Sequence, residues 1–171
     1  MAALSVVKRR KRIPSGRDDL AWWRNARFGL FVHWGLYSVP AGVWRGKRLP
    51  GASEVLMLTQ RLPVATYARL AAQFHPRAWD ADAIVALAKA AGMGYVVITA
   101  KHHDGFAMFR SAASPFNVAD ATPWHRDPLA ELARAGRRVR LPLGFYYSQD
   151  LDWEHPDGAW TVHDVEGSRL L

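Results

Sequence analysis

Tyr95-Val-Val-Ile-Thr-Ala-Lys-His-His-Asp-Gly-Phe106 is the stretch that decides the fold, because an apolar run ends there in a cluster of polar side chains. An apolar run of this length is typical of a parallel strand that is buried on both faces. Ligands gather at the carboxyl ends of such strands in open α/β sheets and in barrels. The imidazoles of His102 and His103 and the carboxylate of Asp104 are therefore candidates for a functional site, with a plain polar turn as the alternative.

The same pattern of an apolar run followed by a polar and aromatic loop occurs twice more. A first strand is predicted over residues 28–34 and ends near His33, and a third is predicted over residues 143–148. Segments with helical spacing separate the three runs. Strands that alternate with helices predict an α/β fold with a parallel sheet, whose functional loops share one rim.

Residues 80–92 give the clearest helix signal in the chain. Asp80 is suited to the N-cap, and Gly92 can adopt the left-handed conformation that ends a helix. Apolar residues recur with helical period, which predicts the face that meets the core. The residues of that predicted face are Ile84, Leu87, Ala88 and Ala91.

Composition sets outer limits on the function. The chain has 171 residues, half of them hydrophobic, which suits one globular domain, and it has no cysteine, which excludes disulfides and thiolate metal sites. The net charge of +8 comes largely from a basic run at residues 8–12 and from arginines near residues 134–140. A tail and a helix face do not make a continuous phosphate-binding surface, so we expect no nucleic-acid partner.

The chain ends and the apolar runs bear on localisation. No apolar run reaches 18 residues, and the apolar residues before the basic run are too few for a signal peptide, so we expect a cytoplasmic protein without a membrane partner. We expect a basic tail over residues 1–17, one catalytic-type domain over residues 18–158 and an unrelated tail over residues 159–171.

Three segments together carry a resemblance to a known family. They are Arg27-Phe-Gly-Leu-Phe-Val-His-Trp-Gly-Leu-Tyr-Ser-Val-Pro-Ala-Gly42, Lys101-His-His-Asp-Gly-Phe-Ala-Met-Phe109, and Phe145-Tyr-Tyr-Ser148 with Asp152-Trp153. In this order and spacing they resemble the N-terminal part of the catalytic domain of family 29 glycoside hydrolases, the α-L-fucosidases. The resemblance implies a TIM-like (β/α)8 barrel. This chain is expected to hold about three of its βα units, so that the barrel is incomplete in this chain.

The resemblance also implies a reaction and a set of binding residues. Family members hydrolyse terminal α-L-fucosyl linkages of glycans and glycosides with retention, through an aspartate nucleophile and a carboxylic acid/base, without metal or cofactor. Both carboxylates are expected beyond residue 171, so the chain alone is expected to be inactive. The residues that match fucose-holding positions are His33, Glu54, His102, His103 and Tyr146.

Elementary chemistry fits that set. Imidazoles can donate and accept hydrogen bonds, and a carboxylate can accept from neighbouring hydroxyls, as a deoxysugar pocket requires. Tyr147 should face the opposite side of its strand. Two departures from the family pattern are Val55, where a tryptophan is common, and Arg140, where a glycine usually precedes the third strand.

Two other functions remain open from the sequence. One is a metal-dependent barrel hydrolase, in which His102, His103 and Asp104, together with His33, would bind a divalent ion. The other is a carbohydrate-binding remnant that keeps the pocket but has lost the reaction. Metal content separates the first from a fucosidase, and turnover measured beside binding separates the second.

Overall fold

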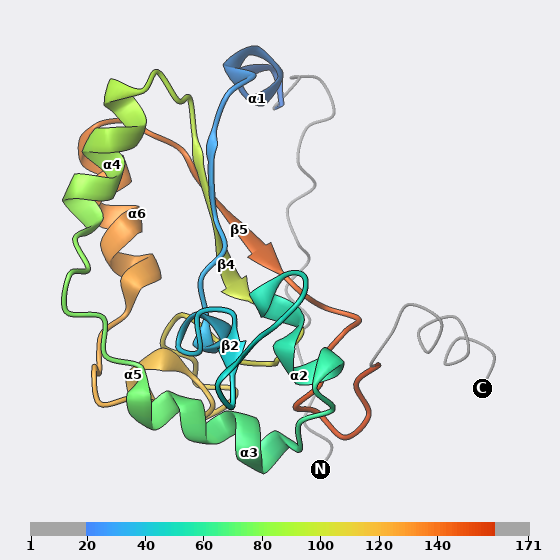
Figure 1. Cartoon of the computed structure of the whole chain (residues 1–171). Helices are drawn as coiled ribbons and strands as arrows, with labels where there is room; N and C mark the ends of the chain where they lie inside the picture. Colours follow the sequence, from blue (N-terminus) through green and yellow to red (C-terminus); the bar gives the residue numbers. More distant parts are fainter. Residues whose placement is uncertain (1–19, 160–171) are drawn as a thin grey trace, which may run out of the picture.

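The fold is built on a three-stranded parallel sheet, seen here in a computed structural model that describes residues 20–159. The strands are β1 (Leu30–Val32), β4 (Val96–Lys101) and β5 (Leu143–Tyr147), in the spatial order β1-β4-β5 (Figure 1). Leu30 pairs with Val96, which in turn pairs with Leu143. The predicted α/β fold with a parallel sheet is confirmed.

Helix α1 precedes β1, and the remaining elements lie in the two connections between these strands. The connection from β1 to β4 is long and contains the small antiparallel ribbon β2–β3 together with several short helices and α4, and the connection from β4 to β5 contains α5 and α6. The bounds are α1 (Ala21–Ala26), η1 (Leu36–Ser38), β2 (Val43–Trp44), β3 (Lys47–Arg48), η2 (Ser53–Val55), α2 (Leu56–Thr59), α3 (Val64–Ala68), η3 (Arg69–Gln73), α4 (Ala81–Ala90), α5 (Val118–Ala121) and α6 (Pro128–Arg138).

The second and third strands match their predicted ranges, 95–100 and 143–148, to within one residue at each end, and the first strand matches least. β4 is buried on both faces, as its unbroken apolar run indicates. β1 is only three residues long, against the predicted 28–34. It ends early because the backbone N–H of Trp34 donates to the Thr99 hydroxyl at 2.9 Å instead of to a strand partner.

Helix α4 has the predicted ends, and its buried face is in part the predicted one. The Asp80 carboxylate accepts from the N–H of Ala83 at 2.9 Å, and Gly92 is left-handed with φ of 77°. Of the predicted face, Ala88 is buried and Ile84 packs against the core, whereas Leu87 is 68% exposed and Ala91 is exposed. Ala81 and Val85 are buried in addition. The helix packs against α6, and no part of the chain within residues 20–159 buries Leu87.

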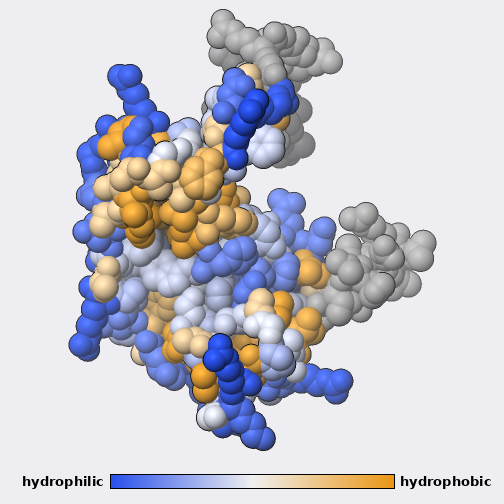
Figure 2. Space-filling view, turned by 45° about the horizontal axis from the view of Figure 1, so that its top comes forward, coloured by the Kyte–Doolittle hydropathy of each residue, from blue (hydrophilic) through white to orange (hydrophobic). Residues whose placement is uncertain are grey.

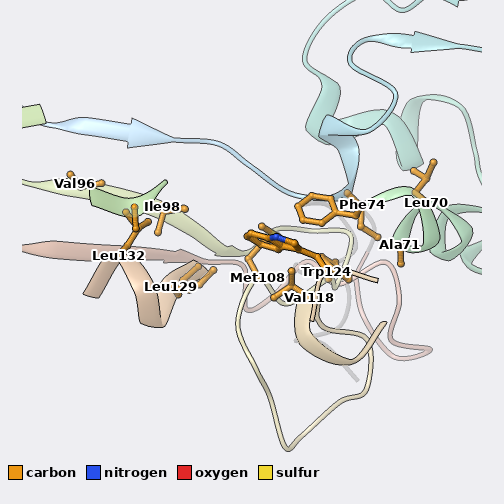
Figure 3. Close-up of a cluster of buried hydrophobic side chains, with 14 of the residues drawn as sticks. Leu70, Ala71, Phe74, Val96, Ile98, Met108, Val118, Trp124, Leu129 and Leu132 are labelled. Carbon is orange, nitrogen blue, oxygen red and sulfur yellow. The ribbon is translucent and has the colours of Figure 1, made fainter. Parts of the chain in front are cut away.

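The core lies between the sheet and the helices. Helices α4 and α6 lie together on one side of the sheet in Figure 1. Side chains of β4 meet those of α6 at one end of the cluster in Figure 3, and aromatic rings from the loops fill the other end. There Trp34 stacks on Trp79, with ring centroids 4.6 Å apart, and Trp124 meets both edge-on.

The sheet is covered less completely than a finished core would be. Phe31 of β1 is 50% exposed, and Phe145 and Tyr147 of β5 are 53% and 49% exposed. Figure 2 shows a broad apolar area, in orange, on the face that it displays. No helix within residues 20–159 is long and apolar enough to cross a membrane. The predicted tails, over residues 1–17 and almost all of 159–171, lie outside the described residues.

Candidate functional site

Three of the predicted site residues meet at the carboxyl ends of the three strands. His33 follows β1, His102 follows β4, and Tyr146 of β5 pairs with Thr99. The His102 ring centroid lies 5.7 Å from that of His33 and 5.3 Å from that of Tyr146, whose ring is stacked on it. His33 and Tyr146 are themselves 6.0 Å apart. The rings therefore form one cluster with His102 at its centre.

The other two predicted residues border this cluster. The His103 ring is 4.3 Å from that of His102, and its Nδ1 lies 2.7 Å from the Ser148 hydroxyl. Glu54 is half-buried in η2, where its carboxylate acts electrostatically on His103. Burial lowers the pKa of His103, the Lys101 charge lowers it further, and the Glu54 charge opposes both. All five predicted residues thus belong to one neighbourhood of the fold.

His102 has the most unusual environment in the cluster. The residue is 5% exposed, and burial, followed by the charges of His103 and His33, lowers the pKa of His102 to about 4. Its ring is therefore neutral at pH 7. Its Nδ1 is the one buried side-chain nitrogen or oxygen within residues 20–159 that has no hydrogen-bond partner. Because buried polar atoms are nearly always paired, this nitrogen indicates a ligand group that would meet it.

Asp104 does not join its histidine neighbours. It is 1% exposed, and its carboxylate accepts from the Tyr67 hydroxyl at 2.6 Å and from the N–H of Phe106 at 3.2 Å. Burial raises the pKa of Asp104 to about 6, although both hydrogen bonds lower it. Asp104 therefore shapes the turn after β4. Within residues 20–159 no three His, Cys, Asp or Glu side chains converge to hold a metal ion, so this part of the chain gives the metal alternative no ligand set.

A second group of residues ties the loop after β5 to the histidine pair. The Lys101 ammonium donates to the Asp152 carboxylate at 2.6 Å, with the two side chains 8% and 23% exposed. The N–H of Trp153 donates to the His103 carbonyl at 2.7 Å. Sequence reasoning gave Lys101 and Ser148 no role and left Asp152 between orienting a loop and meeting substrate, although all three lie in the segments that carried the family resemblance.

Tyr37 was also missed by sequence reasoning. It is 3% exposed, its ring centroid is 5.7 Å from that of His102, and its hydroxyl lies 3.3 Å from the Thr99 hydroxyl. The Thr99 hydroxyl donates to the Trp34 carbonyl at 2.7 Å, which fixes the turn after His33. Tyr147, as predicted, lies on the other face of β5, where it lines an apolar groove with Leu129 of α6.

Comparison with known proteins gives a consistent picture. The sequence profile of the family described as Alpha-L-fucosidase matches residues 9–168. Tissue alpha-L-fucosidase of Mus musculus is 41% identical over 165 residues, which are 88% of this chain and 36% of that protein. The Homo sapiens protein of the same name is 38% identical over 165 residues, 88% of this chain and 35% of its own length.

Solved structures agree with the sequence relatives. Alpha-L-fucosidase AlfC from Lactobacillus casei in complex with alpha-L-fucose product superposes with a TM-score of 0.81 at 49% identity, covering 84% of this chain and 44% of that one. The enzyme from Vibrio sp. superposes with a TM-score of 0.80 at 47% identity, covering 82% and 24%.

The extent of these matches has two consequences. The profile match starts within the expected basic tail and continues past residue 158, where the sequence had suggested that family likeness ends. The chain spans about a third of the length of the curated relatives. Because the profile covers most of the chain and the parallel sheet superposes on solved fucosidases, the chain belongs to the alpha-L-fucosidase family.

Proposed function

We propose that the histidine cluster is the sugar-binding half of a retaining α-L-fucosidase that cleaves terminal α-L-fucosyl residues from glycans or glycosides. The observation that carries the proposal is the unpaired, buried Nδ1 of His102, at the centre of the rings of His33, His103 and Tyr146. Support comes from the Lactobacillus casei enzyme, which has been solved with its alpha-L-fucose product and, as a variant, with Fuca(1,6)GlcNAc.

The chemistry of the cluster suits a neutral deoxysugar. Fucose presents hydroxyls that need both donors and acceptors, and it presents apolar C–H groups that need aromatic surface. The neutral imidazole of His102 can serve a hydroxyl without attracting an anion, and the partly exposed Tyr146 ring offers a flat apolar surface. Glu54 adds an acceptor for a second hydroxyl.

We assign substrate binding, and not bond cleavage, to these residues. Retaining hydrolysis needs two carboxylates about 5–5.5 Å apart. The two aspartates nearest the cluster are already engaged, Asp104 by Tyr67 and Asp152 by Lys101. The nucleophile and the acid/base are therefore proposed to come from other parts of a complete enzyme, whose barrel would continue the β1-β4-β5 sheet into a closed (β/α)8 form.

A carbohydrate-binding role without catalysis is the second candidate for the 171-residue chain. The same engaged aspartates favour it, because they leave the cluster able to hold a sugar but not to cleave it. The two proposals share the site and differ only in turnover. Cytoplasmic localisation stays a prediction of the sequence.

Binding of L-fucose to the chain tests the site. We expect His102→Ala to weaken L-fucose binding about 5- to 150-fold, because the loss of a hydrogen bond to a buried partner costs roughly 1–3 kcal/mol. The matched control is His125→Ala, since His125 contacts the Ala119 carbonyl away from the cluster. Calorimetric or NMR titration measures both. Equal affinity of the two variants would exclude His102 as a sugar contact.

A further inference from the structure

Ser148 joins the site to the loop that follows β5. Its hydroxyl oxygen lies 2.7 Å from Nδ1 of His103 and 2.7 Å from the carbonyl oxygen of Leu151. The residue is 5% exposed, and its backbone N–H donates to the Lys101 carbonyl at 2.9 Å. Both short contacts therefore fall on one buried hydroxyl, which has one proton to donate.

The direction of these two hydrogen bonds follows from donor chemistry. A carbonyl oxygen can only accept, so the Ser148 proton must lie toward Leu151. The Ser148 oxygen then offers a lone pair to His103, whose Nδ1 must carry the proton. The reverse arrangement would leave two acceptor oxygens 2.7 Å apart with no proton between them, which costs free energy in a buried site.

We propose that Ser148 is a positioning residue that fixes His103 in the tautomer with the proton on Nδ1, so that Nε2 faces the ligand as a hydrogen-bond acceptor. A neutral imidazole in water prefers the other tautomer, with the proton on Nε2. Within residues 20–159 no hydrogen bond engages Nε2 of His103, which leaves that atom available to a ligand.

The surrounding contacts make the arrangement rigid. The N–H of Trp153 donates to the His103 carbonyl at 2.7 Å, and the Lys101–Asp152 ion pair ties the same two segments together. Gly105 allows this close approach, because it has a φ of 76° and a Cβ there would lie 2.7 Å from an Asp152 carboxylate oxygen. His103 and Ser148 are thus held in register by contacts on both sides of their hydrogen bond.

The tautomer restricts the chemistry of the ligand. An acceptor nitrogen pairs with an O–H group and repels the lone pairs of a carboxylate or phosphate oxygen. If the proposed function holds, His103 accepts a hydrogen bond from a fucose hydroxyl, while the unpaired Nδ1 of His102 serves another group of the sugar. Ser148 would then help the site to select a neutral polyol.

Long-range proton–nitrogen NMR on the 15N-labelled 171-residue chain tests the tautomer directly. At about pH 8.5 the imidazoles are neutral, since their ordinary pKa is about 6.5. The chain has two internal standards. Nδ1 of His125 must donate to the Ala119 carbonyl at 2.9 Å, and Nδ1 of His155 accepts from the N–H of Asp157 at 3.2 Å. His103→Gln assigns the His103 signal through its disappearance.

We expect the His103 signal of the parent chain to match the His125 pattern, with a protonated Nδ1. In Ser148→Ala it should shift toward the His155 pattern, with a protonated Nε2. The control is Ser114→Ala, which should leave His103 unchanged because the Ser114 hydroxyl accepts from the N–H of Phe116 and, within residues 20–159, contacts no histidine. A His155-like signal in the parent chain, or no shift in Ser148→Ala, would overturn the proposal. If Ser148→Ala does not fold, the parent spectrum decides.

Addition of L-fucose separates this proposal from the proposed function. Fucose binding should perturb Nε2 of His103 while the proton stays on Nδ1. If the parent tautomer is as expected but fucose causes no change, the positioning role stands and the sugar assignment fails. If fucose changes the His103 signal but the proton lies on Nε2, the sugar assignment stands and the positioning role fails.

Discussion

His102 and Asp104, two residues apart, are buried with opposite consequences for their protonation. The pKa of His102 falls to about 4, and that of Asp104 rises to about 6, in each case because burial disfavours the charged form. Both groups are therefore held toward neutrality. The two residues differ in their hydrogen bonds. The Asp104 carboxylate accepts from two donors, whereas Nδ1 of His102 has no partner within residues 20–159.

These two shifts give opposing contributions to stability as the pH falls. Unfolded His102 takes up a proton near its ordinary pKa of 6.5, but the folded form does not until about pH 4, so stability is lost between those values. Folded Asp104 takes up its proton near pH 6, before the unfolded form at 3.8, so stability is gained in that window. Each contribution is on the order of 3 kcal/mol, and the two have opposite signs.

Replacement of His102 should reveal the contribution of Asp104 to the pH dependence of stability. We expect His102→Asn to gain stability relative to the parent as the pH falls from about 6.5 to 4, by on the order of 3 kcal/mol, because the variant loses only the unfavourable contribution. Urea unfolding followed by tryptophan fluorescence at several pH values measures the difference. A difference that does not change with pH would show that His102 is not held neutral in the folded chain.

At the scale of elements, local signals predicted what is set locally. The N-cap at Asp80, the left-handed Gly92 and the buried β4 all follow from the chemistry of a few neighbouring residues. The buried face of α4 followed only in part, because Ala88 is buried as predicted but Leu87 would be covered only by an element that packs there. Helical period tells which residues share a face, and the tertiary partner decides which face is buried.

Arg140 gives a second case in which local sequence and structure disagree. It is one of the non-glycine residues with positive φ, at 54°, in the turn between α6 and β5, where the family resemblance led us to expect glycine. A side chain in the left-handed region costs roughly 1–2 kcal/mol. Glycine removes this strain, but its greater conformational freedom in the unfolded chain offsets part of the gain in stability. The turn is therefore a site of local strain.

We expect Arg140→Gly to stabilise the chain by about 0.5–1 kcal/mol, because glycine adopts the left-handed conformation without strain. The matched control is Arg137→Gly in the last turn of α6, which should destabilise by up to about 1 kcal/mol through loss of helix propensity. Urea midpoints compare the two. Destabilisation by both changes would show that the Arg140 side chain makes a contribution that outweighs the strain.

At the scale of the whole molecule, the sheet has edges that no described strand pairs with and apolar side chains that the described residues cover only in part. β1 and β5 each pair on one side, and Phe31, Phe145 and Tyr147 are about half exposed. Unpaired strand edges and exposed apolar area favour association between copies. The 171-residue chain should therefore self-associate even where each copy is folded.

Phe145→Ser should reduce that association with little loss of stability. The side chain is 53% exposed in an apolar groove beside α6, so its removal costs limited burial, on the order of 1 kcal/mol. Phe145→Leu keeps the apolar surface and serves as the control. Light scattering at matched concentrations compares the variants. Equal association of the serine and leucine variants would show that the copies associate through a different surface.

The 171-residue chain should bind a fucoside without turning it over. Asp104 and Asp152 are committed to Tyr67 and Lys101, and their arrangement gives no nucleophile paired with an acid. We expect release of nitrophenol from nitrophenyl α-L-fucoside to equal that of a vector control. Sustained release that disappears in Asp104→Asn or Asp152→Asn would contradict this and make the chain an enzyme in its own right.

The site itself was predictable in part. The rule that parallel strands deliver their carboxyl ends to one rim pointed to His102 and His103, whereas the full set with His33, Glu54 and Tyr146 came from the family resemblance. The contacts between Lys101 and Asp152, and between His103 and Ser148, join residues 51 and 45 positions apart. No periodicity connects such positions, so only the folded chain reveals them. Asp104 was misleading because, once the strand has ended, adjacent side chains no longer keep a fixed direction.

The interlocked loops after β4 and β5 also bear on the order of events during synthesis. Every residue of the proposed sugar cluster lies between His33 and Ser148. The hydrogen bonds and the ion pair around the cluster join segments that follow directly paired strands. A ribosome releases such a segment before any later part of a longer protein, and neighbouring units can associate as they emerge. The proposed sugar-binding cluster would then form on a nascent chain before the proposed catalytic carboxylates of a longer enzyme are synthesised.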